Sequence, residues 1–433
     1  VSSAMEMAKD VIYIHDWWLS PELYMRRPAN GNQEWRLDRI LKRKAEQGVK
    51  IFVIVYRNVG STVVTDSLWT KHSLIDLHPN IHVLRSPNQW LQNTYFWAHH
   101  EKLCIIDHTV AFVGGIDLCY GRYDTPDHVL VDDSPHDFAT KQNANEESIK
   151  YQKFPGKDYS NPRVKDFFEL DKPYESMYDR DAVPRMPWHD VHMVTAGQPA
   201  ADLGRHFVQR WNYLLRQKRP SRPTPILTPP SEFSPDNLER FNLTGKCEVQ
   251  LLRSSGNWSL GLKKTEHSIQ NAYLKLIETS EHFVYLENQF FVTASAFDGT
   301  VIENRIGDAL VDRIIRAHNE KKKWKAVIMI PLMPGFESQV DEAEGSAVRV
   351  IMQCQYMSIS RGSTSIFAKL KKMKINPYDY IQFFSLRKWG RIGPNRKIVS
   401  EQLYIHGKTM IVDDRVAIIG SANINERSQR GNR

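Results

Sequence analysis

The sequence predicts an α/β protein made of two pseudo-symmetric α/β/α halves that pack around one composite site at their interface. Three observations predict this fold: two copies of a His-x-Lys-x4-Asp motif, apolar strand-like runs that alternate with segments of helical period, and the recurrence of this order in both halves. Alternation of strands and helices favours layered units, and we expect each half to contain a mixed, mostly parallel sheet.

Each half contains, in the same order, a β-rich run, a helical segment, a buried strand and a motif. These lie at 11–14, 37–41, 51–55 and 100–107 in the first half, and at 283–286, 311–315, 326–330 and 406–413 in the second. The second half carries extra residues between its helix and its motif, which we place in 335–400. A duplication explains this arrangement better than chance matches to one short motif.

The repeat divides the chain into three parts. We predict a first half at 1–125, an insertion with a Pro-rich linker at 126–240, and a second half at 241–433 that is truncated at its end. Prolines recur between Pro220 and Pro235 and exclude helix and central strand there. Because the chain opens without a signal sequence and stops soon after the second motif, we expect flanking segments outside it.

Composition limits the function classes. The 433 residues are 41% hydrophobic and 11% aromatic, which indicates a folded core and excludes a disordered chain. The net charge of +8 favours anionic partners: nucleic acid, phospholipid headgroups or a phosphorylated substrate. The four cysteines form no CxxC pair, so they indicate buried thiols in a reducing compartment. No apolar run approaches the ~20 residues of a membrane span, so we expect only peripheral membrane contact.

The two motifs supply a set of groups suited to phosphoryl chemistry. Residues i and i+2 of a strand share a face, so His100 lies beside Lys102 and His406 beside Lys408. One neutral imidazole can attack phosphorus and form a phosphohistidine, and the other, protonated, can donate to the departing alkoxide. The two ammonium groups stabilise charge on the phosphoryl oxygens. No metal is required, and no carboxylate cluster suited to Mg²⁺ or Ca²⁺ stands near either motif.

Other residues near the motifs are candidates for supporting roles. Small residues seven to ten positions beyond each motif aspartate let backbone amides approach a bound anion, and the substrate-binding candidates there are Gly115, Asp117, Ser421 and Asn423. Trp188 and His189 can shape the substrate channel, or simply pack beside proline.

A carboxylate on the far ring nitrogen of a histidine would orient the nucleophile. Glu287 is our candidate for this orienting acid, with His15 at the corresponding position of the first half. The alternative is that Glu287 is a buried acid satisfied by a backbone amide.

The chain resembles the phospholipase D superfamily, and in particular its eukaryotic, phosphatidylcholine-hydrolysing, fungal-like branch. The resemblance covers nearly the whole chain, and besides the two motifs it is carried by the segments 95–102, 114–118, 187–190, 210–212 and 287–291. The resemblance implies that His100 is the nucleophile and His406 the acid and base, while Asp107 and Asp413 hold the motif loops. It also implies hydrolysis of phosphatidylcholine to phosphatidic acid and choline without a cofactor, and transfer of the phosphatidyl group to primary alcohols.

Two other functions are open at this point. One keeps the fold and makes the chain a nuclease-type phosphodiesterase, favoured by the positive charge. The other is a catalytically silent membrane-binding scaffold, which intact motif histidines and lysines disfavour. We expect a cytoplasmic monomer, peripheral on membranes, with no nucleic-acid partner.

Three basic segments could contact an anionic membrane. Lys321–Lys325 ends a helical segment and is expected to be solvated. Lys369–Lys374 and Arg387–Arg391 are candidates for a phosphoinositide-containing surface, because a Trp flanked by cations suits the interface.

Overall fold

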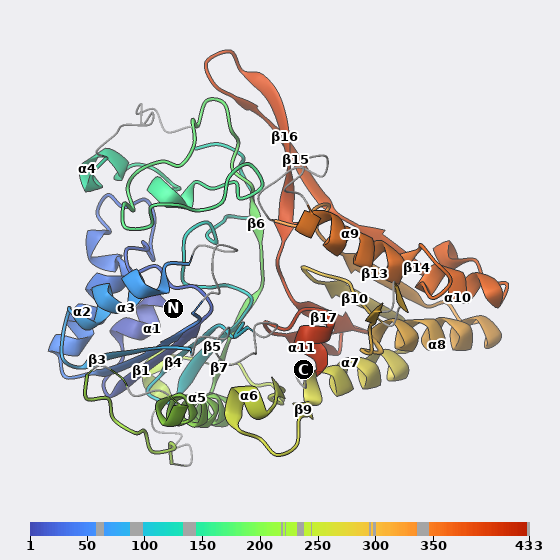
Figure 1. The fold of residues 1–433 in the computed structure, drawn as a ribbon, viewed down its shortest axis with the longest axis horizontal. Coiled ribbons are helices and arrows are strands. Elements are labelled where there is room, and N and C mark those ends of the chain that lie inside the picture. Colours follow the sequence, from blue (N-terminus) through green and yellow to red (C-terminus); the bar gives the residue numbers. More distant parts are fainter. Residues whose placement is uncertain are drawn as a thin grey trace.

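The computed structural model describes residues 1–57, 65–86, 98–132, 144–217, 220, 222–231, 238–243, 245–293, 296–297, 300–335 and 346–430. Within these residues the strands gather into a six-stranded sheet in the first half and a five-stranded sheet in the second. Figure 1 shows two lobes side by side, each with helices packed along its sheet. No described helix is long and apolar enough to cross a membrane.

The first sheet has the order β3-β2-β1-β4-β5-β7. Strands β1, β2 and β3 run parallel, whereas β4, β5 and β7 each run antiparallel to the preceding strand in the sheet. The strands are β1 (Val11–Asp16), β2 (Lys50–Val55), β3 (Ile81–Arg85), β4 (Leu103–Ile106), β5 (Val110–Gly114) and β7 (His192–Ala196). Helices α1 (Ser2–Glu6), α2 (Leu37–Glu46), α3 (Ser67–Ile75) and α5 (Gln198–Gln217) accompany them.

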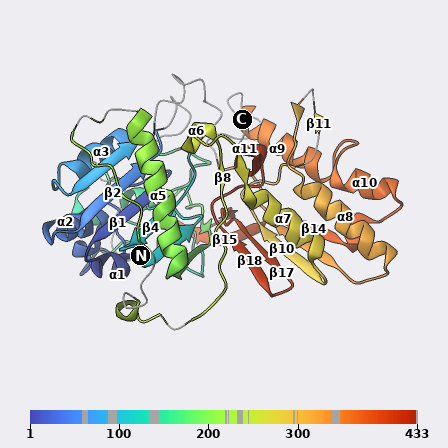
Figure 2. The same ribbon diagram turned by 90° about the horizontal axis from the view of Figure 1, so that it is seen from below.

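Both faces of this sheet are buried. In β1, Ile12 and Ile14 pack into a core with residues of α2, whereas Val11 and Tyr13 pack into a separate core with residues of α5. Burial on both faces explains why the strand reads as a continuous apolar run instead of an alternating one. Figure 2 shows α5 lying across the strands of the first lobe. The segment predicted as an insertion therefore contributes β7 and α5 to the first half.

The second sheet repeats the first. Its order is β14-β13-β10-β17-β18, with the same directions as β3-β2-β1-β4-β5. The strands are β10 (Phe283–Glu287), β13 (Lys325–Met329), β14 (Ile381–Phe384), β17 (Thr409–Val412) and β18 (Val416–Ile419). One core joins it to α7 (Ser268–Thr279), α8 (Ile306–Asn319) and α10 (Ile366–Lys372). His15 lies opposite Leu103 and Glu287 opposite Thr409, so the repeat holds residue by residue.

The prediction of two α/β halves with mixed sheets is confirmed. Both sheets are mixed, with at least as many antiparallel pairs as parallel ones. The reason is that β4–β5 and β17–β18 are hairpins joined by short turns, and a short connection can only join antiparallel neighbours.

A long hairpin connects the halves. Strands β15 (Leu386–Ile392) and β16 (Lys397–Ile405) pair antiparallel and project from the body in Figure 1. The base of β16 pairs in parallel with β6 (Trp188–His189), so Tyr404 lies opposite Trp188 and Ile405 opposite His189. This contact brings the Trp188–Asp190 segment beside the second motif. The remaining elements are α4 (Glu146–Ile149), α6 (Asn257–Leu260), α9 (Ser346–Ile359), α11 (Glu426–Arg430), β8 (Ser254–Ser255), β9 (Glu266–His267), β11 (Ala296–Phe297) and β12 (Thr300–Val301).

Candidate active site

The two His-x-Lys triplets lie in extended segments immediately before β4 and β17, not within the strands as predicted. Each lysine ammonium still lies beside its own histidine, because it donates to that histidine's backbone carbonyl: Lys102 Nζ to His100 O at 3.0 Å, and Lys408 Nζ to His406 O. Each ammonium is also close enough to its own imidazole to lower that histidine's pKa.

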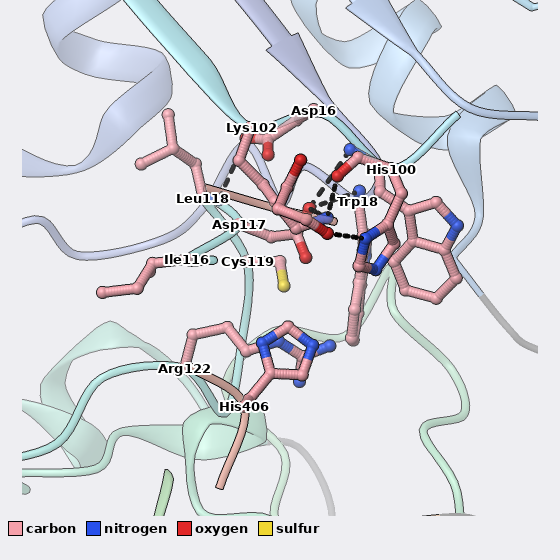
Figure 3. Close-up of polar contacts among 12 residues, drawn as sticks. Asp16, Trp18, His100, Lys102, Ile116, Asp117, Leu118, Cys119, Arg122 and His406 are labelled. Atoms are coloured by element: carbon pink, nitrogen blue, oxygen red, sulfur yellow. Dashed lines mark hydrogen bonds and ion pairs between the residues drawn. The ribbon is translucent and has the colours of Figure 1, made fainter. Parts of the chain in front are cut away.

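The structure brings the two motif histidines together across the halves. The ring centroids of His100 and His406 are 6.1 Å apart (Figure 3). His100 Nδ1 lies 2.9 Å from the backbone carbonyl oxygen of Ser421, which belongs to the other half. A carbonyl oxygen only accepts hydrogen bonds, so Nδ1 carries the proton and Nε2 keeps its lone pair. The contact gives His100 the tautomer that a nucleophile needs.

His406 is held differently, by a carboxylate. Its Nδ1 lies 2.7 Å from Asp190 Oδ2, and both side chains are nearly fully buried. Asp190 is itself fixed by the indole N–H of Trp188 at 3.0 Å and the backbone N–H of Val191 at 2.8 Å. Burial raises the pKa of Asp190, and the charge of Lys408 opposes that rise. A carboxylate in this position can stabilise a positive charge that develops on the His406 ring.

Both histidines are neutral in the resting site. Burial lowers the pKa of His100 well below its ordinary value, and the charges of Lys102 and Lys408 lower it further. Burial also lowers the pKa of His406 well below its ordinary value, and the charges of Lys408 and Arg122 lower it further. A neutral imidazole is the form that can attack phosphorus.

Arg122 is a site residue that the sequence analysis missed. Its guanidinium lies 4.0 Å from the centroid of the Trp188 ring, and Figure 3 shows it pointing toward His406. Its charge lowers the pKa of His406, of Lys408 and of Asp117, so it acts on both half-sites. The available signal was its place five residues after Asp117, in a segment that leaves the first motif's hairpin.

The motif aspartates occupy equivalent structural positions. Asp107 accepts hydrogen bonds from the backbone N–H groups of Lys9, Asp10 and Val11 at 2.8 to 2.9 Å. Asp413 accepts from the backbone N–H groups of 281–283 at 2.7 to 2.8 Å. Each carboxylate joins the hairpin turn of its motif to the start of the neighbouring strand, β1 or β10. Neither contacts the motif histidines in these hydrogen bonds.

We expect Asp413→Asn to lower the free energy of unfolding by about 1–2 kcal/mol at pH 7, because one of two acceptor oxygens and the charge are lost. Burial opposes ionisation, but the backbone N–H groups outweigh it and lower the pKa of Asp413. A lowered folded-state pKa stabilises above the unfolded value of ~3.9 and stops doing so as pH falls through the folded value. Urea unfolding at pH 7 and pH 3 should therefore show a difference that shrinks at pH 3.

The neighbouring Asp414→Asn is the matched control, because Asp414 is exposed and also has a positive φ of 55°. Equal losses of stability in Asp413→Asn and Asp414→Asn would contradict the assigned role of Asp413.

Glu287 does not take the predicted orienting position. Its carboxylate lies 3.2 Å from His189 Nε2 and accepts from the Tyr285 hydroxyl at 2.5 Å, whereas Asp190 and the Ser421 carbonyl hold the motif histidines. The prediction placed Glu287 from the internal repeat alone. The repeat cannot reveal that the Trp188–Asp190 segment enters the site through β6.

The remaining predicted binding residues lie at the site, with changed roles. The Gly115 N–H donates to Val191 O at 2.9 Å, so it is not free for an anion, and an added Cβ would meet Asp190 Oδ1 at 2.0 Å. Gly115 thus makes room for Asp190. The Trp188 ring is tilted against the His406 ring, with centroids 4.7 Å apart, and its indole N–H donates to Asp190. The predicted segment 95–97 lies outside the described residues.

Among the residues that the structure describes, no group of three or more His, Cys, Asp or Glu side chains has the arrangement to hold a metal ion.

The family model described as Phospholipase D matches residues 4–433. Phospholipase D1 of Saccharomyces cerevisiae is 66% identical over 439 residues, covering 100% of this chain and 25% of that protein. Phospholipase D1 of Schizosaccharomyces pombe is 57% identical over 434 residues, covering 100% and 31%. Phospholipase D2 of Bos taurus is 42% identical over 447 residues, covering 100% and 47%. The chain therefore spans less than half the length of these relatives.

Proposed function

This chain belongs to the phospholipase D family, and from that premise we propose that it hydrolyses phosphatidylcholine to phosphatidic acid and choline through a covalent phosphohistidine. The observation that carries the proposal is that the ring centroids of His100 and His406 lie 6.1 Å apart. Nε2 of His100 is unprotonated, and the Asp190 carboxylate lies against Nδ1 of His406. The names of the yeast relatives support the same activity.

In the first step, His100 Nε2 attacks phosphorus and forms an N–P bond while the bond from phosphorus to the choline oxygen breaks. His406 Nε2 gives its proton to that oxygen, and choline leaves. The resting histidine is neutral, so it takes up this proton from solvent when the phosphodiester anion enters and offsets the nearby cations. Asp190 stabilises the resulting imidazolium.

In the second step, His406 takes a proton from water, whose oxygen attacks phosphorus as the N–P bond breaks. Phosphatidic acid leaves and His100 is restored. A primary alcohol can take the place of water, and the product is then a phosphatidyl alcohol. Lys102 and Lys408 stabilise the phosphoryl oxygens throughout, and side chains alone perform these steps without a cofactor.

The test is purified protein on phosphatidylcholine vesicles with and without ethanol. We expect choline release in both and phosphatidylethanol only with ethanol. Choline release without phosphatidylethanol would contradict the covalent route. A phosphodiester oligonucleotide tested in parallel addresses the nuclease alternative, which the net charge of +8 favours: cleavage of the oligonucleotide instead of the lipid would replace the proposal.

The β15–β16 hairpin is the proposed membrane contact, specific for anionic phosphoinositides. Alternation along β15 places Arg387, Trp389 and Arg391 on one exposed face, and the Trp389 side chain is 67% exposed. Ile398, opposite Arg391, adds an exposed apolar side chain. A Trp flanked by cations fits the interface of an anionic bilayer. In the other candidate segment, Lys369 is paired with Asp308 at 2.7 Å.

Reversing both arginines of the hairpin, Arg387→Glu with Arg391→Glu, should weaken binding to phosphoinositide-containing vesicles by about 10-fold or more, since each basic residue near such a surface contributes ~1 kcal/mol. Vesicle sedimentation measures this effect. The double variant Lys321→Glu with Lys323→Glu, in the exposed segment that follows α8, is the matched control and should bind normally. Undiminished binding by the hairpin variant would remove this membrane site from the proposal.

A further inference from the structure

Two buried carboxyl groups lie directly behind Lys102. Asp16 ends β1 and Asp117 follows β5, and each binds the backbone of the other's segment (Figure 3). Asp117 Oδ1 accepts from the N–H groups of Trp17 and Trp18 at 3.1 and 3.2 Å, while Asp16 Oδ2 accepts from Leu118 N–H at 3.0 Å. Each of the two aspartates is only 2% exposed.

The surroundings of this pair favour one shared proton. Asp16 Oδ1 is fully buried and faces no hydrogen-bond donor among the described residues. Burial and the neighbouring Asp117 raise the pKa of Asp16 well above its ordinary value. Burial opposes ionisation of Asp117 as well, but Lys102, at 3.1 Å, and Arg122 outweigh it and lower the pKa of Asp117 to about 2. These surroundings favour the proton on Asp16 and the negative charge on Asp117.

The second half has the same arrangement with amides in place of carboxyl groups. Asn288 corresponds to Asp16 and Asn423 to Asp117. The backbone contact is preserved, because Ile424 N–H donates to Asn288 Oδ1 at 3.0 Å, as Leu118 N–H does to Asp16. Both asparagines are buried, and Asn423 Oδ1 has no partner among the described residues. The substitution keeps the shape and removes the charge.

The two motif lysines consequently have different partners. Lys102 Nζ pairs with the Asp117 carboxylate at 3.1 Å. Lys408 Nζ is equally buried, but its nearest side-chain partner is the neutral amide oxygen of Gln289 at 3.3 Å. The Asp117 carboxylate largely balances the positive charge of Lys102 before any ligand arrives, whereas Lys408 has no direct ion pair with a carboxylate among the described residues.

We infer that the Asp16–Asp117 pair, carrying one proton, fixes Lys102 as a permanently paired cation, and that the isosteric Asn288–Asn423 pair leaves Lys408 as the lysine that takes up a proton and gives its charge to the phosphoryl group. Asp16 is then a positioning residue that acts through Asp117. The inference rests on the proposed function, because it assigns unequal tasks within the same site.

The surroundings of Lys408 agree with this division. Burial lowers the pKa of Lys408 to about 7, with Asp190 and Asp117 opposing the change and Lys102 and Arg122 adding to it. At pH 8 such an ammonium is mostly deprotonated. A bound anion favours the charged form, so binding at this pH brings a proton with it.

The first test determines which aspartate of the pair carries the proton, and it measures stability instead of catalysis. Asp16→Asn replaces the carboxyl O–H with an amide N–H, so the donor to Asp117 is kept. We expect its urea midpoint to match that of the wild type, and the double variant Asp16→Asn with Asp117→Asn, which leaves Lys102 without a carboxylate, to unfold at a clearly lower urea concentration. If Asp16→Asn alone is as destabilised as the double variant, Asp16 is not the protonated partner and the inference fails.

The second test measures proton uptake by calorimetry of sulfate binding at pH 8 in buffers of different ionisation enthalpy. Sulfate keeps its charge over this range, so any proton is taken up by the protein. From a lysine pKa of about 7, we expect Lys408 to contribute between about half and one proton to the uptake by the wild type. Lys408→Met should take up fewer protons by this amount, because only the uptake by His406 remains. Binding without uptake, no binding by the wild type, or equal uptake in Lys408→Met would each overturn the inference, whereas absence of lipase activity would not affect this measurement.

Discussion

Replacing His100 with asparagine is expected to lower kcat for phosphatidylcholine hydrolysis by about 10⁴-fold or more, because the proposed N–P bond cannot form. The Ser421 carbonyl that holds His100 Nδ1 at 2.9 Å leaves only Nε2 to attack phosphorus. With a ³²P-labelled lipid and an alkaline quench, which preserves phosphohistidine, the wild type should carry label and His100→Asn should carry none.

Two variants control this experiment. His406→Asn should also be slow, but a substrate with an activated leaving group should still label His100, since the second histidine only moves protons. His282→Asn is the matched control, because the His282 side chain is 70% exposed and lies outside the site. Label on the His100→Asn protein would assign the nucleophile elsewhere.

Removing the charge of Asp190 is expected to have the second-largest effect. Both carboxylate oxygens accept hydrogen bonds, Oδ2 from His406 and Trp188 and Oδ1 from Val191. Asp190→Asn must turn an N–H₂ group toward one of these donors and no longer stabilises an imidazolium. Loss of an orienting carboxylate costs up to ~10⁴-fold in comparable histidine-dependent enzymes, and we expect about 10²- to 10⁴-fold in kcat.

A pH profile separates this role from simple misfolding. Without Asp190 the protonated form of His406 is less stable, so the pH at which the acid form is lost during turnover should move downward. Glu287→Gln is the matched control, because Glu287 contacts His189 instead of a motif histidine. We expect it to cost less than about 10-fold. A larger loss in Glu287→Gln than in Asp190→Asn would restore the role first predicted for Glu287.

The sequence by itself predicted the two-half fold and the motif pairing. The repeat of strand, helix, strand and motif is a local pattern, and the structure reproduces it down to the register of His15 with Leu103 and of Glu287 with Thr409. The same pattern indicated that His100, Lys102, His406 and Lys408 belong to one site. Side-chain type and spacing were sufficient here because both halves bury the same face of the same motif.

Only the tertiary structure decided which groups hold the histidines. Asp190 and Ser421 reach them from other segments, Asp190 through the parallel pairing of β6 with β16 and Ser421 across the interface between the halves. No sequence period relates these positions, because they depend on how separately formed elements pack. The exchange of Asp16 and Asp117 for Asn288 and Asn423 was visible in the sequence. The effect of this exchange on the motif lysines depends on burial, which only the structure shows. Carboxyl and amide groups differ most in their electrostatic effect where water cannot screen them.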